Sequence, residues 1–177
     1  MRALVIAVIL LTACYAASDS QFTDLANSAR AGDVAKIREL AAEGADPNAV
    51  AGQNNWTPLL HAIHKHQNAS VTALLGAGAD VNRAGHDGVT PLMMAAGYGF
   101  DDTVQLLLKR GANASLKGSE EGSALDWALL GTTDIDRFTY FTCQDSTVRL
   151  LRSAAPTLQP TAGARRWAKM KRCATSS

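Results

Sequence analysis

Thr57-Pro58-Leu59-Leu60-His61-Ala62 is the stretch that decides the fold, because it returns 33 residues later as Thr90-Pro91-Leu92-Met93-Met94-Ala95. A weaker copy, Ser123-Ala124-Leu125-Asp126-Trp127-Ala128, follows after another 33 residues. A fixed period of this length is the signature of a stacked repeat architecture. The sequence therefore predicts one structural unit that is repeated along the chain.

Each unit begins with the signals of a helix N-terminus. Thr57 and Thr90 can cap a helix, and the prolines that follow them stand at the first helical position, where a missing N–H costs little. A second apolar stripe follows, at Val71, Leu74 and Leu75 and again at Val104, Leu107 and Leu108. Glycines at 44, 78 and 111 then mark the helix ends, since glycine adopts the left-handed conformation of a C-cap. Each unit is thus predicted to form two helices that end in a glycine turn.

This pattern resembles the ankyrin-repeat family, in which Gly-Ala-Asp at 44–46 and 78–80 and Gly-Ala-Asn at 111–113 would follow the second helix. The resemblance covers about residues 21–155. It implies an all-α fold, an ankyrin-repeat solenoid of about four stacked helix-hairpin repeats with β-turn fingers. The expected repeats are 21–50, 51–83, 84–116 and 117–155. The last contains an insertion at 131–142, rich in aromatic residues, which is expected either to cover the open end of the stack or to bind a partner.

The first residues indicate export. Arg2 precedes an apolar run from Ala3 to Leu11, which is too short to span a bilayer but typical of a signal peptide, here residues 1–13. Leu11-Thr12-Ala13-Cys14 resembles the lipobox of bacterial lipoproteins. That resemblance implies lipidation of Cys14 and a membrane-anchored protein in the periplasm. An ordinary signal peptide, cleaved nearby, is the alternative.

The C-terminal segment contains Cys173 and a basic run, and the other remaining cysteine, Cys143, lies in the expected last repeat. An exported protein meets an oxidising environment, where a disulfide between Cys143 and Cys173 would tie this segment to the last repeat. Two free thiols are the alternative. Residues 156–177 are predicted to form a flexible basic tail, because they combine Pro160 and Gly163 with five closely spaced Lys and Arg residues. Contact of this basic run with anionic lipid headgroups is a second reading.

Composition and motifs argue against several function classes. The formal net charge is only +1, so the sequence predicts no nucleic-acid partner. The chain contains no nucleophile elbow, P-loop, H-E-x-x-H or glycine-rich dinucleotide motif, so it is predicted not to be an enzyme and to need no cofactor.

Three histidines raise the question of a metal. His61, His64 and His66 lie within six residues, and the first two share a helix face at i, i+3 spacing. The repeat pattern accounts for each of them locally, so no metal site is assigned. A metal-handling or redox accessory protein that uses this cluster and the cysteine pair remains the alternative function.

The ankyrin resemblance implies a binding surface for another protein, made of finger tips and the exposed side of the inner helices. Mapped onto this sequence, the partner-binding residues are Arg30, Gln53, Asn54, Trp56, His64, Lys65, His86, Asp87, Val89, Tyr98 and Glu120. Trp56 and Tyr98 are the expected anchors, because large aromatic side chains dominate interface energies. For Trp56, packing against the base of a finger is the alternative.

The expected function is therefore that of a non-catalytic binding module in the bacterial envelope. Such a module would bind a partner protein and neutralise or stabilise it, either as an immunity-type antagonist of a toxin or as the helper of a periplasmic enzyme. The partner's identity does not follow from the sequence.

Overall fold

The structure is a computed structural model that describes residues 24–50, 55–86, 88–118, 122–131 and 143–173. The chain is helical over residues 24–31. It then forms α2 (Val34–Ala42), α3 (Pro58–His64), α4 (Asn68–Gly76), α5 (Pro91–Tyr98), α6 (Asp101–Lys109), α7 (Ala124–Leu130), α8 (Asp145–Ala154) and α9 (Ala162–Lys171). No strand forms in these ranges, and the expected all-α solenoid is confirmed. None of the helices within them is long and apolar enough to cross a bilayer.

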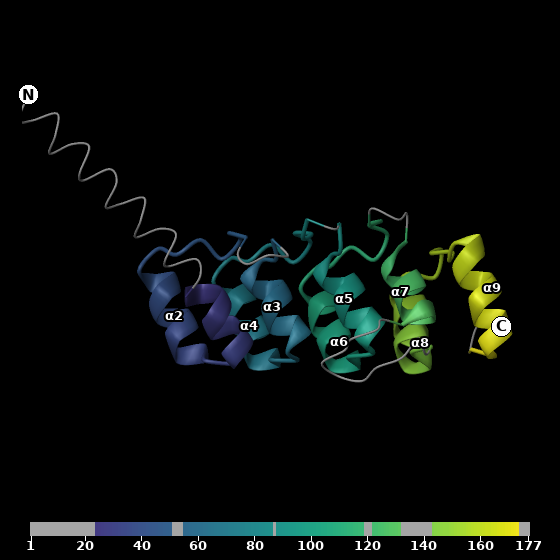
Figure 1. Cartoon of the computed structure of the whole chain (residues 1–177), viewed down its shortest axis with the longest axis horizontal. Helices are drawn as coiled ribbons and strands as arrows, with labels where there is room; N and C mark the ends of the chain where they lie inside the picture. Colours follow the sequence, from purple (N-terminus) through teal and green to yellow (C-terminus); the bar gives the residue numbers. More distant parts are fainter. Residues whose placement is uncertain (1–23, 51–54, 87, 119–121, 132–142, 174–177) are drawn as a thin grey trace, which may run out of the picture.

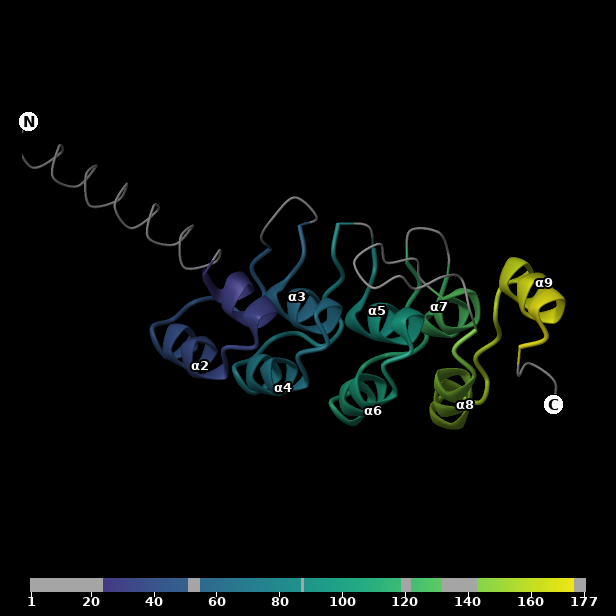
Figure 2. The same cartoon turned by 60° about the horizontal axis from the view of Figure 1, so that its bottom comes forward.

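The helices stack side by side along the long axis of the molecule (Figure 1). Figure 2 shows an inner row that contains α3, α5 and α7, an outer row of α2, α4, α6 and α8, and loops projecting from the inner side. Each inner helix packs against the next and against its own outer helix. The core that results is continuous and is built mainly from leucine, alanine and valine. Each unit therefore buries its apolar face on its neighbours.

The threonine caps are formed as the sequence predicts. Thr57 Oγ1 accepts a hydrogen bond from the Leu60 N–H at 3.3 Å, and Thr90 Oγ1 accepts one from the Met93 N–H at 3.2 Å. The loops are linked in the same periodic way. The Asn48 side chain accepts a hydrogen bond from the Asp80 N–H at 2.7 Å, and Asn82 accepts one from the Asn113 N–H at 2.8 Å. These bonds fix the spacing between neighbouring loops.

A second ladder joins the outer helices. The third residue of an outer helix donates a hydrogen bond to the first residue of the preceding one: Thr103 in α6 donates to Asn68 in α4, and Thr147 in α8 donates to Asp101 in α6. The equivalent residue of α4 is Ser70. Its hydroxyl is buried and has no acceptor among the described residues, because the first residue of α2 is Val34. The ladder is thus incomplete at its N-terminal end.

We expect Val34→Asp to stabilise the fold by about 1 kcal/mol, since it offers the buried Ser70 hydroxyl an acceptor. Urea unfolding followed by circular dichroism measures the gain. A carboxylate at a helix N-terminus is favourable by itself, so the same substitution in a Ser70→Ala background is the control. If the gain is equal in both backgrounds, the ladder explanation is wrong.

The C-terminal segment differs from the prediction. A flexible tail was expected over residues 156–177, and this expectation is wrong for residues 162–171, which form α9. Ala164 and Ala168, four residues apart, are buried and let α9 approach α7 closely. Thr161 caps α9 by accepting a hydrogen bond from the Ala164 N–H at 3.2 Å. Its backbone angles, φ −60° and ψ 159°, match those of Thr57, φ −70° and ψ 159°.

These features make α9 the first helix of a fifth unit, of which the described residues contain no second helix. It continues the inner row beyond α7 in Figure 2. Cys143 and Cys173 are joined by a disulfide with their Cα atoms 5.8 Å apart, which ties the end of α9 to the segment before α8. Residues 1–13, Cys14 and, apart from Gly131, the insertion at 131–142 lie outside the described ranges.

Candidate protein-binding surface

Six ring side chains form a chain of contacts across the second and third repeats. We call this set the ring strip; it consists of Trp56, His61, His64, His66, Tyr98 and Phe100. Trp56 directly precedes Thr57, the cap of α3, two histidines lie on α3, and His66 lies in the loop after it. Tyr98 is the last residue of α5, and Phe100 caps α6. The strip therefore joins two repeats.

Trp56 begins the strip. Its ring centroid lies 5.6 Å from that of His61 and 5.2 Å from that of His64. The side chain is half-buried, and its buried indole N–H has no acceptor among the described residues. The side chain thus packs on α3 and still keeps an exposed fraction.

His64 joins the ring strip of one repeat to Tyr98 of the next. Its Nδ1 lies 2.9 Å from the Tyr98 hydroxyl, and the two rings are 5.8 Å apart. Tyr98 in turn stacks on Phe100 at 5.2 Å. The hydrogen bond between His64 and Tyr98 holds these side chains in one arrangement, together with the contacts that His64 makes with Trp56 and Tyr98 makes with Phe100. Rigid rings lose little entropy when a partner binds.

His66 ends the strip in an unusual backbone conformation. Its φ is +56°, whereas the equivalent positions in the neighbouring repeats are Gly32 and Gly99, with φ +82° and +72°. A left-handed conformation costs a non-glycine residue about 1 kcal/mol. Stacking offsets this cost, because the His66 and Phe100 rings lie 3.9 Å apart and nearly parallel.

Gly32 and Gly99, the equivalents of His66 in the neighbouring repeats, are each covered by a glutamine side chain. A Cβ on Gly32 would lie 2.6 Å from Gln67 Oε1, and a Cβ on Gly99 would collide with the Gln144 side chain. A glutamine therefore covers a glycine at those two repeat boundaries, whereas Phe100 covers His66 at the boundary between them.

Asp102 stabilises this end of the strip. Its carboxylate lies 3.0 Å from His66 Nε2, and it also accepts hydrogen bonds from the Asn68 amide and the Thr103 N–H. Partial burial would raise the pKa of Asp102, but hydrogen bonds from His66 and Thr103 outweigh burial and lower it. Asp102 therefore remains an acceptor for these donors at neutral pH.

The comparisons with known proteins agree with this architecture. A family model described as ankyrin repeats (three copies) matches residues 25–118 and again residues 67–137, more than half of the chain. The chain belongs to the ankyrin-repeat family.

Curated relatives share the repeats over short segments. The ankyrin chain is 36% identical over 73 residues to the 2-5A-dependent ribonuclease of Mus musculus, covering 41% of this chain and 10% of that protein. It is 34% identical over 86 residues to the B-cell lymphoma 3 protein homolog of Mus musculus, covering 49% and 19%. The human mitochondrial disaggregase matches at 38% over 78 residues, covering 44% and 11%. The matched segments thus span less than a fifth of each relative.

Ankyrin repeats indicate a protein-binding module, and the family is generally non-enzymatic. Several residues expected to bind the partner of this ankyrin protein are accessible. Arg30 and His86 are exposed, and Lys65 is half-buried at the end of α3. Gln53, Asn54, Asp87 and Glu120 lie outside the described residues.

The expectation for Val89 is wrong. This side chain belongs to the core and is only 6% exposed. Its carbonyl accepts a hydrogen bond from the Gly85 N–H at 3.1 Å, which closes the base of the finger over the inner helix. Val89 thus packs in the core at the base of the finger, and its side chain is not available to a partner.

The histidines of the ankyrin repeat do not converge on a metal. Among the described residues, no group of three or more His, Cys, Asp or Glu side chains is arranged to hold an ion. His64 faces Tyr98, whereas His66 faces Phe100 and Asp102.

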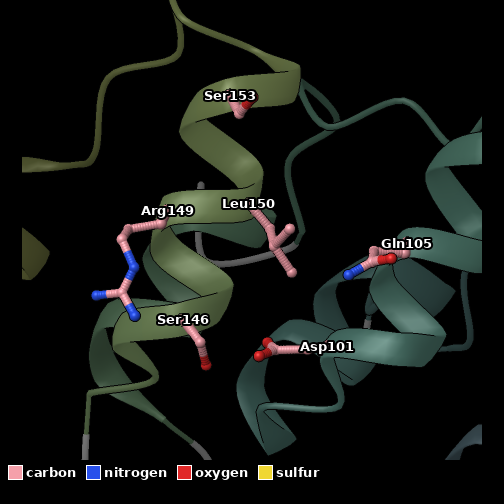
Figure 3. Close-up of a pocket in the computed structure, with 6 residues that line it drawn as sticks. All are labelled: Asp101, Gln105, Ser146, Arg149, Leu150 and Ser153. Carbon is pink, nitrogen blue, oxygen red and sulfur yellow. The ribbon is translucent and has the colours of Figure 1, made fainter.

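Two shallow grooves lie elsewhere, between the outer ankyrin helices. The groove between α6 and α8 has a volume of about 330 Å³ and is lined by Asp101, Gln105, Ser146, Arg149, Leu150 and Ser153 (Figure 3). Asp101 already accepts the hydrogen bond from Thr147. The other groove, about 390 Å³, separates α2 from α4. Such grooves arise where stacked outer helices diverge.

Proposed function

We propose that this chain is an exported, non-catalytic ankyrin module of the bacterial envelope that binds one partner protein through the ring strip. By binding, it neutralises or stabilises that partner, as an immunity-type antagonist of a toxin or as the helper of a periplasmic enzyme. The observation that carries the binding surface is the ring strip itself. Export is supported by the apolar run before Cys14 and by the cysteine pair.

The composition of the strip suits a protein interface. Trp and Tyr are enriched among the residues that dominate binding energies, because they combine a large apolar area with a polar tip. Trp56 and Tyr98 lie on consecutive repeats, and both contact the ring of His64. A partner that covers both would bury a continuous aromatic surface, which supports the choice of these two residues as anchors.

The strain at His66 points the same way. Glycine would relieve the left-handed backbone, as in the neighbouring repeats, yet this chain has a ring that stacks on Phe100. Backbone strain of this kind tends to be found at functional sites. The His66–Phe100 stack extends the aromatic surface to the loops between the inner and outer helices, so it enlarges the area that a partner can contact.

The proposal predicts that Trp56→Ala with Tyr98→Ala abolishes partner capture. Tagged wild-type and variant chains are incubated with a native envelope extract, and affinities for the captured protein are then measured by calorimetry. We expect a loss of at least about thirtyfold, the effect of removing one hot-spot residue.

Leu150→Ala with Met170→Ala is the matched control, since it removes two accessible apolar side chains outside the strip. It should leave capture unchanged. If the wild type captures nothing specific, or if the aromatic double variant binds as well as the control, the ring strip is not the binding surface.

A further inference from the structure

The charges of this chain are strongly separated along the solenoid. All 16 acidic residues lie before position 146, whereas seven of the 17 Lys and Arg residues lie after it. Five of these seven fall between residues 165 and 172, on or next to α9. The small net charge of the whole chain therefore conceals a strongly positive C-terminal end.

Four of these five charges, those other than Lys171, lie together at one side of α9 and its C-terminal end. At about 100° per residue, Arg165, Arg166, Lys169 and Met170 fall on one side of the helix, Arg172 follows as its C-cap, and all five are exposed. We call this set the basic end face. Ala164 and Ala168 lie on the opposite side and are buried. Because α9 is the last described helix of the stack, no described helix covers the basic end face (Figures 1 and 2).

An apolar side chain projects from among the cations. Met170 is 66% exposed, and apart from Val50 it is the only large hydrophobic side chain so exposed in the described residues. Trp167, at the border of the face, is half-buried and lies under the Lys171 ammonium at 4.9 Å. Cations around an exposed apolar group are typical of helices that lie in a membrane interface.

We propose that the basic end face binds the surface of an anionic lipid bilayer. The arginine and lysine side chains would contact headgroup phosphates, and Met170 would enter the boundary between headgroups and acyl chains. A terminal repeat needs only a polar outer side, of either charge sign, so capping alone does not account for a face with four cations and no acid. An exposed face with a projecting methionine suits a deformable lipid surface better than the preformed groove of an acidic protein.

The fold presents this face in a fixed orientation. The Thr161 N–H at the start of α9 donates to Asp126, and the disulfide holds Cys173 just beyond its end. A preorganised helix loses little conformational entropy when it binds, unlike a disordered basic tail that must first fold. The ring strip belongs to α3, α5 and the residues that flank them, so lipid binding at α9 is independent of the proposed protein partner.

Vesicle flotation tests the proposal. The full chain with Cys14→Ser, which cannot be lipidated, is mixed with vesicles of phosphatidylcholine alone or with roughly 30% phosphatidylglycerol. In this background, Arg165→Gln, Arg166→Gln and Lys169→Gln are combined in one variant. Each cation near an anionic surface contributes about fivefold, so we expect about a hundredfold weaker partitioning onto the anionic vesicles at low salt.

The control variant combines Arg38→Gln, Arg83→Gln and Lys109→Gln, which removes the same charge from exposed sites away from α9. It should bind anionic vesicles nearly as the Cys14→Ser parent does, and circular dichroism should show that both variants are folded. Equal binding of the parent to both vesicle types, or equal losses in the two variants, would overturn the proposal. Binding to polyglutamate that depends on α9, without vesicle binding, would assign the face to an acidic protein instead.

Discussion

Asp126→Ala should lower the unfolding free energy by about 3 kcal/mol. Asp126 is only 2% exposed. One carboxylate oxygen accepts hydrogen bonds from the Ser123 N–H at 2.8 Å and the Ser123 hydroxyl at 2.7 Å, and the other accepts one from the Thr161 N–H at 2.6 Å. Alanine would leave these donors unpaired in the interior, where each lost bond costs about 1–3 kcal/mol.

The position of Asp126 within its repeat explains this large effect. The equivalent residues of the two preceding repeats are Leu60 and Met93, which are fully buried in the core. In the last repeat the carboxylate both completes the cap of α7 and binds the first turn of α9. One side chain therefore links the fourth repeat to the helix that covers it.

Urea denaturation followed by circular dichroism measures the loss. Asp33→Ala is the matched control, because Asp33 caps α2 from an exposed position through the Lys36 N–H. An exposed cap contributes about 1 kcal/mol. If Asp126→Ala costs no more than Asp33→Ala, then the buried hydrogen bonds of Asp126 do not hold α9 on the stack.

The same carboxylate makes stability depend on pH. Burial would raise the pKa of Asp126, but hydrogen bonds from Ser123 and Thr161 outweigh burial and lower it below its usual 3.8. A group whose pKa is lower in the folded state stabilises the protein above its unfolded-state pKa and loses that contribution as the pH falls through the folded-state value. Unfolding free energies measured from about pH 6 down to about pH 2 should therefore fall less steeply for Asp126→Asn than for the wild type. Parallel curves would contradict this assignment.

The repeat architecture could be predicted from the sequence because local chemistry determines it. The Thr-Pro starts at 57 and 90 and the glycines at 78 and 111 specify where helices begin and end in any context. Helix α9 has a threonine cap at Thr161, but no proline follows that cap and no glycine ends the helix. Gly163 suggests a break, and Ala164 and Ala168 become core residues only because α7 lies beside them. Tertiary packing, which a local pattern does not contain, stabilises this helix.

The candidate site was predictable to a similar degree. The repeat pattern assigned Trp56, His64 and Tyr98 to one expected binding surface, but it did not predict that the ring of His64 contacts the other two. It did not reveal Phe100, because the stack with His66 joins residues 34 positions apart in different loops. The signal available was a histidine at a position where the neighbouring repeats have Gly32 and Gly99. Val89 was misplaced because the repeat register does not show how the base of its finger closes.

Opening the disulfide should cost about 3–4 kcal/mol, because the Cys143–Cys173 bond closes a segment with a sequence separation of 30 and restricts the unfolded chain. Cys143→Ser with Cys173→Ser removes the bond, and a reducing agent should produce the same loss in the wild type. The reducing agent should have no effect on the double variant. If it destabilises both proteins equally, the bond is not the source of the difference.

The disulfide and Asp126 should not act additively, because they hold opposite ends of the same helix. Asp126 binds the start of α9 through Thr161, and Cys173 lies just after its end. If the loss of one link already separates α9 from α7, removing the second link lowers the unfolding free energy by less than it would alone. The combined variant should therefore lose less than the sum of the separate losses, by about 1–2 kcal/mol, whereas distant independent sites would add. Strict additivity would mean that α9 stays docked with either link alone, and that Ala164 and Ala168 suffice to hold this helix on the stack.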